Sequence, residues 1–134
     1  MPIDYGVITD EFERHWSNRE YKEALAVYYY GNRPFWLADD VAGYFERTGQ
    51  IEKAMQEYEY LVNAYLETRQ DFLPLPNGPP ELFKLGKWYA FRDKVKARKY
   101  LKLYLAAETE CGRDPAFYLP HKNAAKRLLG KLAL

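Results

Sequence analysis

Glu11 and His15 are the two residues of this chain whose types and spacing best fit acid–base or metal chemistry. They stand four residues apart, so on a helix they share one face and could bind a metal ion or share a proton. His121, the second histidine, lies far away in the sequence. Structural and catalytic metal sites ordinarily use three or more protein ligands, and only two are placed here. We therefore expect no metal and no other cofactor, and a metal-dependent enzyme built on this pair is the weaker alternative.

Nucleophilic and nucleotide-dependent catalysis also lack a motif in the sequence. Cys111 precedes Gly112 and has no histidine near it in the sequence, so a buried or incidental thiol explains it better than a nucleophile does. The sequence contains neither a glycine-rich phosphate loop nor a nucleophile elbow. We therefore predict a protein that is not an enzyme.

Cysteine content and hydropathy predict the compartment. One cysteine cannot form an internal disulfide, which fits a reducing compartment. The first thirteen residues are acidic and lack the basic and apolar regions of a signal peptide. No apolar stretch approaches the roughly 20 residues of a membrane helix. We expect a cytoplasmic protein with no membrane partner.

The charges divide unevenly along the chain. Residues 1–71 hold 14 acids and 7 bases, whereas residues 72–134 hold 5 acids and 13 bases. One interpretation is two differently solvated faces. The other is an electrostatic dipole that orients a partner or stacks copies of the chain head to tail.

Apolar residues recur at helical spacing through most of the chain, and no strand pattern of useful length occurs. We therefore predict an all-α protein. Asp10 with Glu13, and Ser17 with Glu20, have the spacing of capping boxes at the starts of the first two helices. Gly31 is expected to end the second helix. The predicted helices cover about 8–16, 21–30, 34–47, 50–68, 80–91, 94–110 and 120–132, with a proline-rich loop at 70–80.

A small residue followed by a large one recurs three times in the sequence. The pairs are Ala24 with Tyr28, Ala54 with Tyr58, and Ala97 with Leu101. Each alanine stands early in the second helix of a predicted hairpin, where a small side chain lets paired helices approach closely. The residue one turn later fills the remaining gap, so a repeat of helical hairpins is predicted. Contact with the next hairpin would account for Tyr29 and Tyr30, which point elsewhere around their helix.

With these repeats the chain resembles the tetratricopeptide repeat (TPR) family over about residues 5–110. The alanines stand 30 and 43 residues apart, where the family period is about 34, and the family's closing proline is absent. Glu11 and His15 replace the expected Leu and Tyr of the first repeat. The matching residues are Tyr21, Ala24 and Tyr28 in the first repeat; Ala42, Phe45, Gly49, Ile51, Ala54 and Tyr58 in the second; and Leu82, Leu85, Gly86 and Tyr89 in the third.

The resemblance implies a single domain over 1–134, built as a superhelical stack of about three antiparallel hairpins and a C-terminal capping helix. The hairpins would cover about 8–30, 34–68 and 80–110, and the terminal helix about 120–133. First helices in the family line a concave groove that binds a peptide or protein segment. Mapped onto this chain, the groove residues are Trp16, Trp36, Asp39, Glu46, Phe83 and Lys87.

The predicted groove residues also limit the partner. Thr9, Glu13 and Asp40 occupy positions where family members that clamp a C-terminal carboxylate carry Lys and Asn, so that clamp is not supported. An acidic and aromatic groove would prefer a basic or amphipathic segment. Packing between hairpins is the alternative explanation for Trp16 and Trp36.

Two further kinds of association stay open. Cations on the last two predicted helices would form a basic patch for nucleic acid if those helices adjoin, although the whole chain is near neutral. Leu129 and Leu134 near the C-terminus would leave an apolar surface for a homodimer. The residues of the basic patch are Lys94, Arg98, Lys102, Lys122, Lys126 and Arg127.

Overall fold

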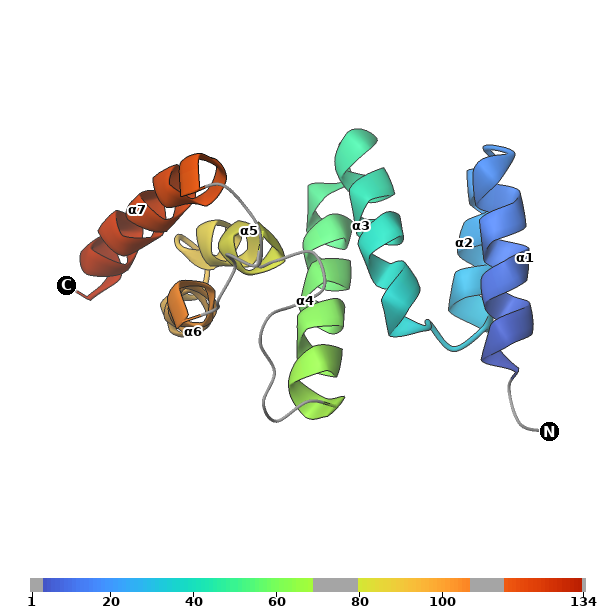
Figure 1. Ribbon diagram of the computed structural model, residues 1–134, viewed down its shortest axis with the longest axis horizontal. Coiled ribbons are helices and arrows are strands. Elements are labelled where there is room, and N and C mark those ends of the chain that lie inside the picture. The colour runs from blue at the N-terminus through green and yellow to red at the C-terminus, as the bar shows by residue number, and fades with distance from the viewer. Residues whose placement is uncertain (1–3, 69–79, 107–114, 134) are drawn as a thin grey trace. The chain divides into compact units, whose positions relative to one another are not determined.

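The computed structural model describes residues 4–68, 80–106 and 115–133 (Figure 1). Within these ranges the chain forms only helices and turns and no strand, so the predicted all-α class is confirmed. Residues 70–79 of the predicted loop at 70–80, the helix end at 107–110, Cys111 and Leu134 lie outside the described residues. The elements are α1 (Tyr5–Ser17), α2 (Tyr21–Tyr30), the 3-10 turn η1 (Phe35–Leu37), α3 (Ala38–Arg47), α4 (Ile51–Thr68), α5 (Pro80–Tyr89), α6 (Lys94–Ala106) and α7 (Pro115–Leu132).

The chain divides into two compact units, Met1–Leu61 and Val62–Leu134, called here the first and second units. Helix α4 contributes residues to both. The single domain expected over 1–134 stays a prediction. None of the helices in the described ranges combines the length and the apolar character that crossing a membrane requires.

Helix α1 begins earlier than its sequence signals predicted. The Asp4 side chain caps it, because Oδ1 accepts hydrogen bonds from the backbone N–H groups of Gly6 at 3.0 Å and Val7 at 3.2 Å. This acceptor satisfies two donors that have no partner inside the helix. Asp10 therefore lies within α1, and the capping box predicted to start at Asp10 was wrong.

The capping box predicted at Ser17 was also wrong. Ser17 is the last residue of α1, and a tight turn containing Arg19 at φ +60° leads into α2. Glu20 precedes α2 without a side-chain capping bond, because its carboxylate lies 3.0 Å from Nδ1 of His15. Glu20 closes the turn instead, and its backbone N–H donates to the His15 carbonyl at 2.8 Å.

Two other helix starts differ from the prediction. The helix expected at Pro34 is replaced by η1, since Pro34 itself has extended backbone at φ −54° and ψ 121°, and α3 begins only at Ala38. Helix α7 begins at Pro115 rather than at Pro120, which lies inside the helix. Proline fits the first turn of a helix because no partner is available there for its missing N–H. Pro115 meets that condition, so the earlier proline marks the start.

The core of the first unit contains the small and large pairs that the repeat predicted. Ala24, Ala54 and Tyr28 are completely buried and Tyr58 is 3% exposed. Gly31 ends α2 as predicted, although its φ of −84° is open to any residue. A Cβ at Gly31 would lie 2.7 Å from Cγ2 of Ile8, so the glycine is needed for close approach of α1 and not for backbone freedom.

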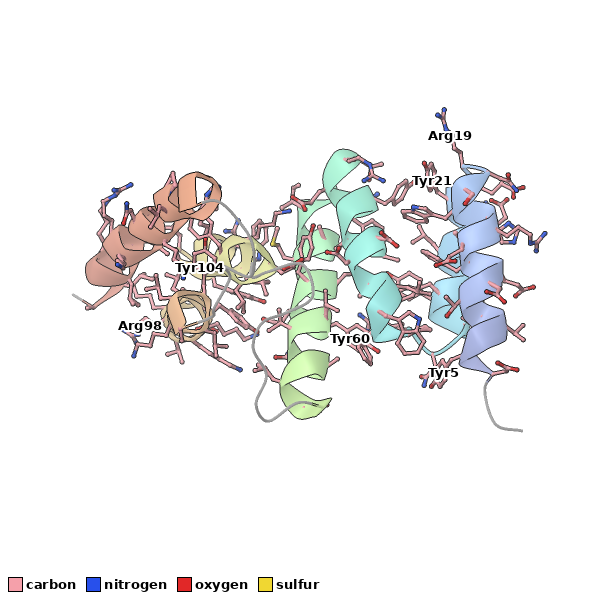
Figure 2. The ribbon with its side chains drawn as sticks, in the orientation of Figure 1. Tyr5, Arg19, Tyr21, Tyr60, Arg98 and Tyr104 are labelled. Atoms are coloured by element: carbon pink, nitrogen blue, oxygen red, sulfur yellow. The ribbon has the colours of Figure 1, made fainter. Side chains whose placement is uncertain are left out.

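The second unit packs α5, α6 and α7 around an apolar core. Ala97 and Leu101 on α6 are fully buried, as the repeat predicted. A Cβ at Gly86 would lie 2.5 Å from Cδ2 of Leu101, so this glycine lets α5 and α6 meet closely. Tyr104, labelled on α6 in Figure 2, stacks on the ring of Phe83 with centroids 5.3 Å apart.

Candidate functional site: an aromatic hollow held by a buried carboxylate

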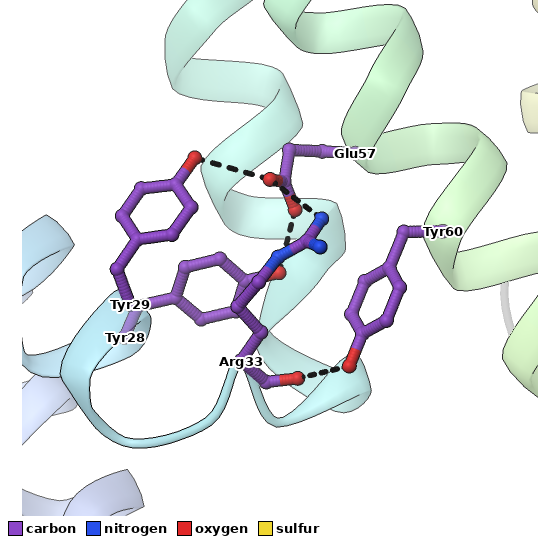
Figure 3. A network of polar contacts seen from close by, with 5 residues as sticks. All are labelled: Tyr28, Tyr29, Arg33, Glu57 and Tyr60. Atoms are coloured by element: carbon purple, nitrogen blue, oxygen red, sulfur yellow. Dashed lines mark hydrogen bonds and ion pairs between the residues drawn. The ribbon is translucent and has the colours of Figure 1, made fainter.

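A buried carboxylate on α4 gathers three donors within the first unit. The Glu57 side chain is 4% exposed and accepts hydrogen bonds from the hydroxyls of Tyr28 at 2.5 Å and Tyr29 at 3.0 Å (Figure 3). Its Oε1 also lies 3.0 Å from Nη2 of Arg33. A buried charge is tolerated when it is both paired and hydrogen-bonded, and Glu57 meets both conditions.

Arg33 and Tyr60 extend this network into the segment that follows α2. The guanidinium of Arg33 lies 3.9 Å from the centroid of the Tyr60 ring, and the Tyr60 hydroxyl donates to the Arg33 carbonyl. Asn32 and Arg33 both have left-handed backbone, at φ +67° and +48°. Such conformations persist in residues other than glycine when surrounding contacts hold them. The network (Glu57, Tyr28, Tyr29, Arg33 and Tyr60, all drawn in Figure 3) supplies those contacts for Arg33, and Nδ2 of Asn32 donates to the Tyr5 hydroxyl at 3.1 Å.

Burial and Glu57 together change the acidity of the tyrosines. Burial, followed by the hydrogen bond to Glu57, raises the pKa of Tyr28 far above its ordinary value. Burial and the charge of Glu57 raise the pKa of Tyr29 to about 12. Burial alone would lower the pKa of Arg33, but Glu57 and Tyr28 outweigh it and the pKa is raised. At neutral pH the tyrosines are therefore donors and the arginine is a cation.

Beside the network lies a small hollow, called here the aromatic hollow, of about 270 Å³. Trp36 is 43% exposed at its edge, and its Nε1 donates to Oγ1 of Thr9 at 3.0 Å. Tyr5, labelled in Figure 2, meets the Trp36 ring edge-on with centroids 5.6 Å apart. Trp36 is therefore both exposed and fixed in orientation. The lining residues are Tyr5, Asn32, Arg33, Pro34, Phe35, Trp36 and Tyr60.

The network and the aromatic hollow share Arg33 and Tyr60. Glu57 anchors the guanidinium of Arg33, and Tyr60 anchors its backbone, so the turn that carries Pro34 and Trp36 is held from α4. This arrangement offers rings and an apolar recess without a nucleophile. Contacts from α4 fix the shape of this recess.

The two tryptophans predicted for a groove occupy different environments. Trp16 is half-buried and stacks on Phe12 with centroids 5.0 Å apart. It also meets Tyr21 and Tyr44 edge-on, at 5.0 and 6.0 Å, so α1, α2 and α3 pack around it. Trp16 does not line the aromatic hollow, whereas Trp36 does.

The predicted acidic residues of α3 lie apart from the aromatic hollow. Glu46 is partly exposed and accepts a hydrogen bond from the Tyr58 hydroxyl. Asp39 is also partly exposed and stands beside Asp40. Partial desolvation, then the charges of Asp39 and Glu13, raise the pKa of Asp40. These acids contribute negative charge to the first unit, and their part in binding stays a prediction.

Phe83 and Lys87, also predicted for the groove, belong to the second unit and contact each other. Phe83 is 8% exposed, and its ring lies between Tyr104 and His121, with the His121 centroid 5.4 Å away. The Lys87 ammonium lies 4.8 Å from the Phe83 ring centroid. Most of the Phe83 ring is therefore used in packing within its own unit.

The predicted basic patch lies on two helices that adjoin. Nη1 of Arg98, labelled in Figure 2, donates to the Leu132 carbonyl at 3.0 Å, which places a cation at the C-terminal end of α7. Lys122 is half-buried. Of the predicted patch, Lys94, Lys102, Lys126 and Arg127 are exposed.

His15 has a different partner from the one that a metal site would need. Its Nδ1 pairs with Glu20 and not with Glu11. Across the described residues no group of three or more His, Cys, Asp or Glu side chains is arranged to hold a metal ion.

Sequence reasoning missed Glu57 and Arg33, the two charged members of the network. Glu57 stands among exposed charges on α4, and nothing in its sequence neighbourhood marks it as buried. The available signal was Tyr29, for which contact with the next hairpin was expected. Tyr29 makes such a contact, because its hydroxyl donates to Glu57 on α4. Tyr30, in contrast, is 92% exposed.

Comparison with known proteins assigns neither a family nor a function to this chain. No family model, no curated protein and no solved structure matches the chain. The resemblance to the TPR family therefore rests on the residues quoted for it, and the site rests on its own contacts.

Proposed function

We propose that this chain is a non-catalytic protein–protein interaction module that binds a peptide or protein segment at the aromatic hollow. The observation that carries the proposal is the state of Trp36, which is 43% exposed yet held by Thr9 and Tyr5. A rigid, exposed tryptophan offers a large contact area and loses little conformational entropy on binding.

The charge of the first unit favours a basic or amphipathic segment. Residues 1–61 contain 12 acids and 6 bases, a net charge of −6. Such a field speeds the encounter with a cationic segment. An apolar side chain of that segment would cover Trp36 and Tyr5, and flanking cations would lie over the acidic surface.

The proposal includes a TPR-like arrangement of the hairpins and a cytoplasmic place of action. The buried alanines Ala24, Ala54 and Ala97 support the arrangement, because each allows close helix pairing at the position that the repeat requires. The single cysteine supports the compartment.

A selection from a random peptide display library on the immobilised full chain tests the function. We expect the selected peptides to be enriched in Lys or Arg together with an apolar residue, and to be lost when Trp36→Ala replaces the wild type. Tyr30→Ala is the matched control, because Tyr30 is an exposed aromatic residue of the same unit that does not line the hollow. Peptides selected equally well by Trp36→Ala would refute the proposal.

Nucleic-acid binding by the second unit is a second candidate function. The Arg98–Leu132 hydrogen bond joins α6 to α7, so the exposed cations of both helices belong to one small unit. Oligonucleotide binding at low salt, weakening steeply as salt is added, would support this candidate. Absence of binding at low salt would remove it.

A further inference from the structure

A larger hollow, called here the basic hollow, lies among α2, α3 and α4 within the first unit and measures about 640 Å³. Leu25 and Phe45 provide apolar lining, and Tyr29 and Tyr44 add rings. Its volume is in the range of ligand-binding pockets. None of its lining residues belongs to the aromatic hollow, so the two are separate surfaces.

The polar lining of the basic hollow carries a charge opposite to that of its unit. Lys22 and Lys53, both exposed, line it together with the amides of Gln50 and Gln56, and no carboxylate from the described part of the chain does. The Lys53 ammonium lies 5.7 Å from the Phe45 ring centroid. Glu57, the acid next to Gln56, is turned instead toward the tyrosines and Arg33.

Positive charge and hydrogen-bond donors here surround an apolar patch in a unit of net charge −6. We infer that the basic hollow binds an acidic peptide segment that carries an apolar side chain. Its carboxylates pair with Lys22 and Lys53, its backbone or side-chain oxygens accept from the glutamine amides, and its apolar side chain covers Leu25 and the exposed ring of Tyr29. Complementary charge is what selects this occupant over a basic one.

The inference does not depend on the proposed function of Trp36. The long-range field of the unit repels an acidic segment, so recognition must come from contacts made inside the hollow. Each exposed ion pair contributes little by itself. Together the two lysines are expected to change the affinity for an acidic segment by about tenfold.

Fluorescence anisotropy with a labelled synthetic peptide of alternating Glu and Leu tests the inference on the full chain. The variant Lys22→Gln/Lys53→Gln is expected to bind this peptide about tenfold more weakly than the wild type. Arg14→Gln/Arg19→Gln is the matched control, since it removes the same charge from exposed residues outside the hollow. The control should retain wild-type affinity, and a peptide with Gln in place of Glu should bind poorly to every variant.

Three outcomes overturn the inference: no binding of the Glu–Leu peptide at low ionic strength, equal losses in the lysine and arginine variants, or displacement of the peptide by a single-stranded oligonucleotide that binds more tightly. The Trp36→Ala variant distinguishes binding at the basic hollow from binding at the aromatic hollow. It should leave the affinity for the acidic peptide unchanged, so failure of either binding surface is distinguishable from failure of the other.

Discussion

Cations lie over aromatic rings in both compact units, but the two units differ in what their tyrosine hydroxyls contact. In the first unit, the hydroxyls of Tyr28 and Tyr29 donate to a buried carboxylate, Glu57. In the second unit, rings lie beneath cations. Those pairs are Lys87 over Phe83, Arg92 over Trp88, Lys96 over Tyr89 and Lys99 over Tyr100, with the cation 4.8, 3.4, 4.9 and 5.5 Å from the ring centroid.

The two kinds of contact should differ in how much they contribute to the free energy of unfolding. Removing one member of a buried, hydrogen-bonded charge pair leaves its partners without compensation and is expensive. An exposed cation over a ring contributes only about 0.5–1 kcal/mol. The first unit should therefore depend on a few polar residues, and the second on the close packing of its helices.

The largest effect should come from Glu57→Gln. The amide keeps the shape but loses the negative charge, and its NH2 group replaces one acceptor oxygen, so Arg33 loses its counter-ion and at least one donor loses its acceptor. We expect the free energy of unfolding to fall by about 3 kcal/mol, the lower end for a broken buried pair, because Arg33 is 36% exposed. Urea denaturation measures this loss.

Glu52→Gln is the matched control for this loss. It makes the same chemical change at an exposed position of the same helix, and should alter stability by less than about 0.5 kcal/mol. Equal effects of the two substitutions would contradict the contrast between the units.

Two glycines of the second unit test how far its stability depends on close packing of the helices. Gly86→Ala places a methyl group 2.5 Å from Leu101, and we expect a loss of about 1–2 kcal/mol after the gain in helix propensity is subtracted. Gly130→Ala meets no atom within 4 Å and should gain about 0.5–1 kcal/mol. In thermal denaturation, the midpoint temperature should fall for Gly86→Ala and rise for Gly130→Ala. Stabilisation by Gly86→Ala would show that α5 and α6 do not need the glycine.

The tyrosines should make the first unit sensitive to alkaline pH. Both hydroxyls hold their protons more tightly when folded, so their contribution is complete below the ordinary pKa of 10.0 and is lost as the pH rises through the folded values. For Tyr29 that window ends at about 12. We expect Tyr29→Phe to lose about 1 kcal/mol at neutral pH and to decline less steeply than the wild type across the window. Parallel stability profiles would disprove the role of Tyr29.

A small effect should come from Arg92→Ala in the second unit. The exposed guanidinium stacks on Trp88 and donates to its carbonyl at 2.7 Å, yet water can replace both contacts. We expect a loss of no more than about 1 kcal/mol in urea denaturation. A loss of about 2 kcal/mol or more would exceed the change in stability that substitutions at exposed sites usually cause. Arg92 would then be a structural residue of the second unit.

The parts of the fold that could be predicted from sequence are those encoded by nearby residues. Ala24 with Tyr28 and Ala54 with Tyr58 are one helical turn apart, and all four are buried as predicted. The helix starts were less predictable, because Asp4 and Asp10 are equally good capping residues and the backbone uses only the first.

The site was harder to predict because its members are distant in sequence. Glu57 is 24 residues from Arg33 and 29 from Tyr28, and no local pattern joins them. Trp36 was singled out from the sequence as a groove residue. The structure adds that it lies in a 3-10 turn, half exposed and hydrogen-bonded to Thr9.

The central claim is that Trp36 is a binding residue held in place from α4. Calorimetric titration of a display-selected basic peptide into the wild type, Trp36→Ala and Tyr30→Ala tests it most directly, with circular dichroism confirming that each variant is folded. We expect a loss of affinity of at least about tenfold for Trp36→Ala and wild-type affinity for Tyr30→Ala. Wild-type affinity in a folded Trp36→Ala would contradict it.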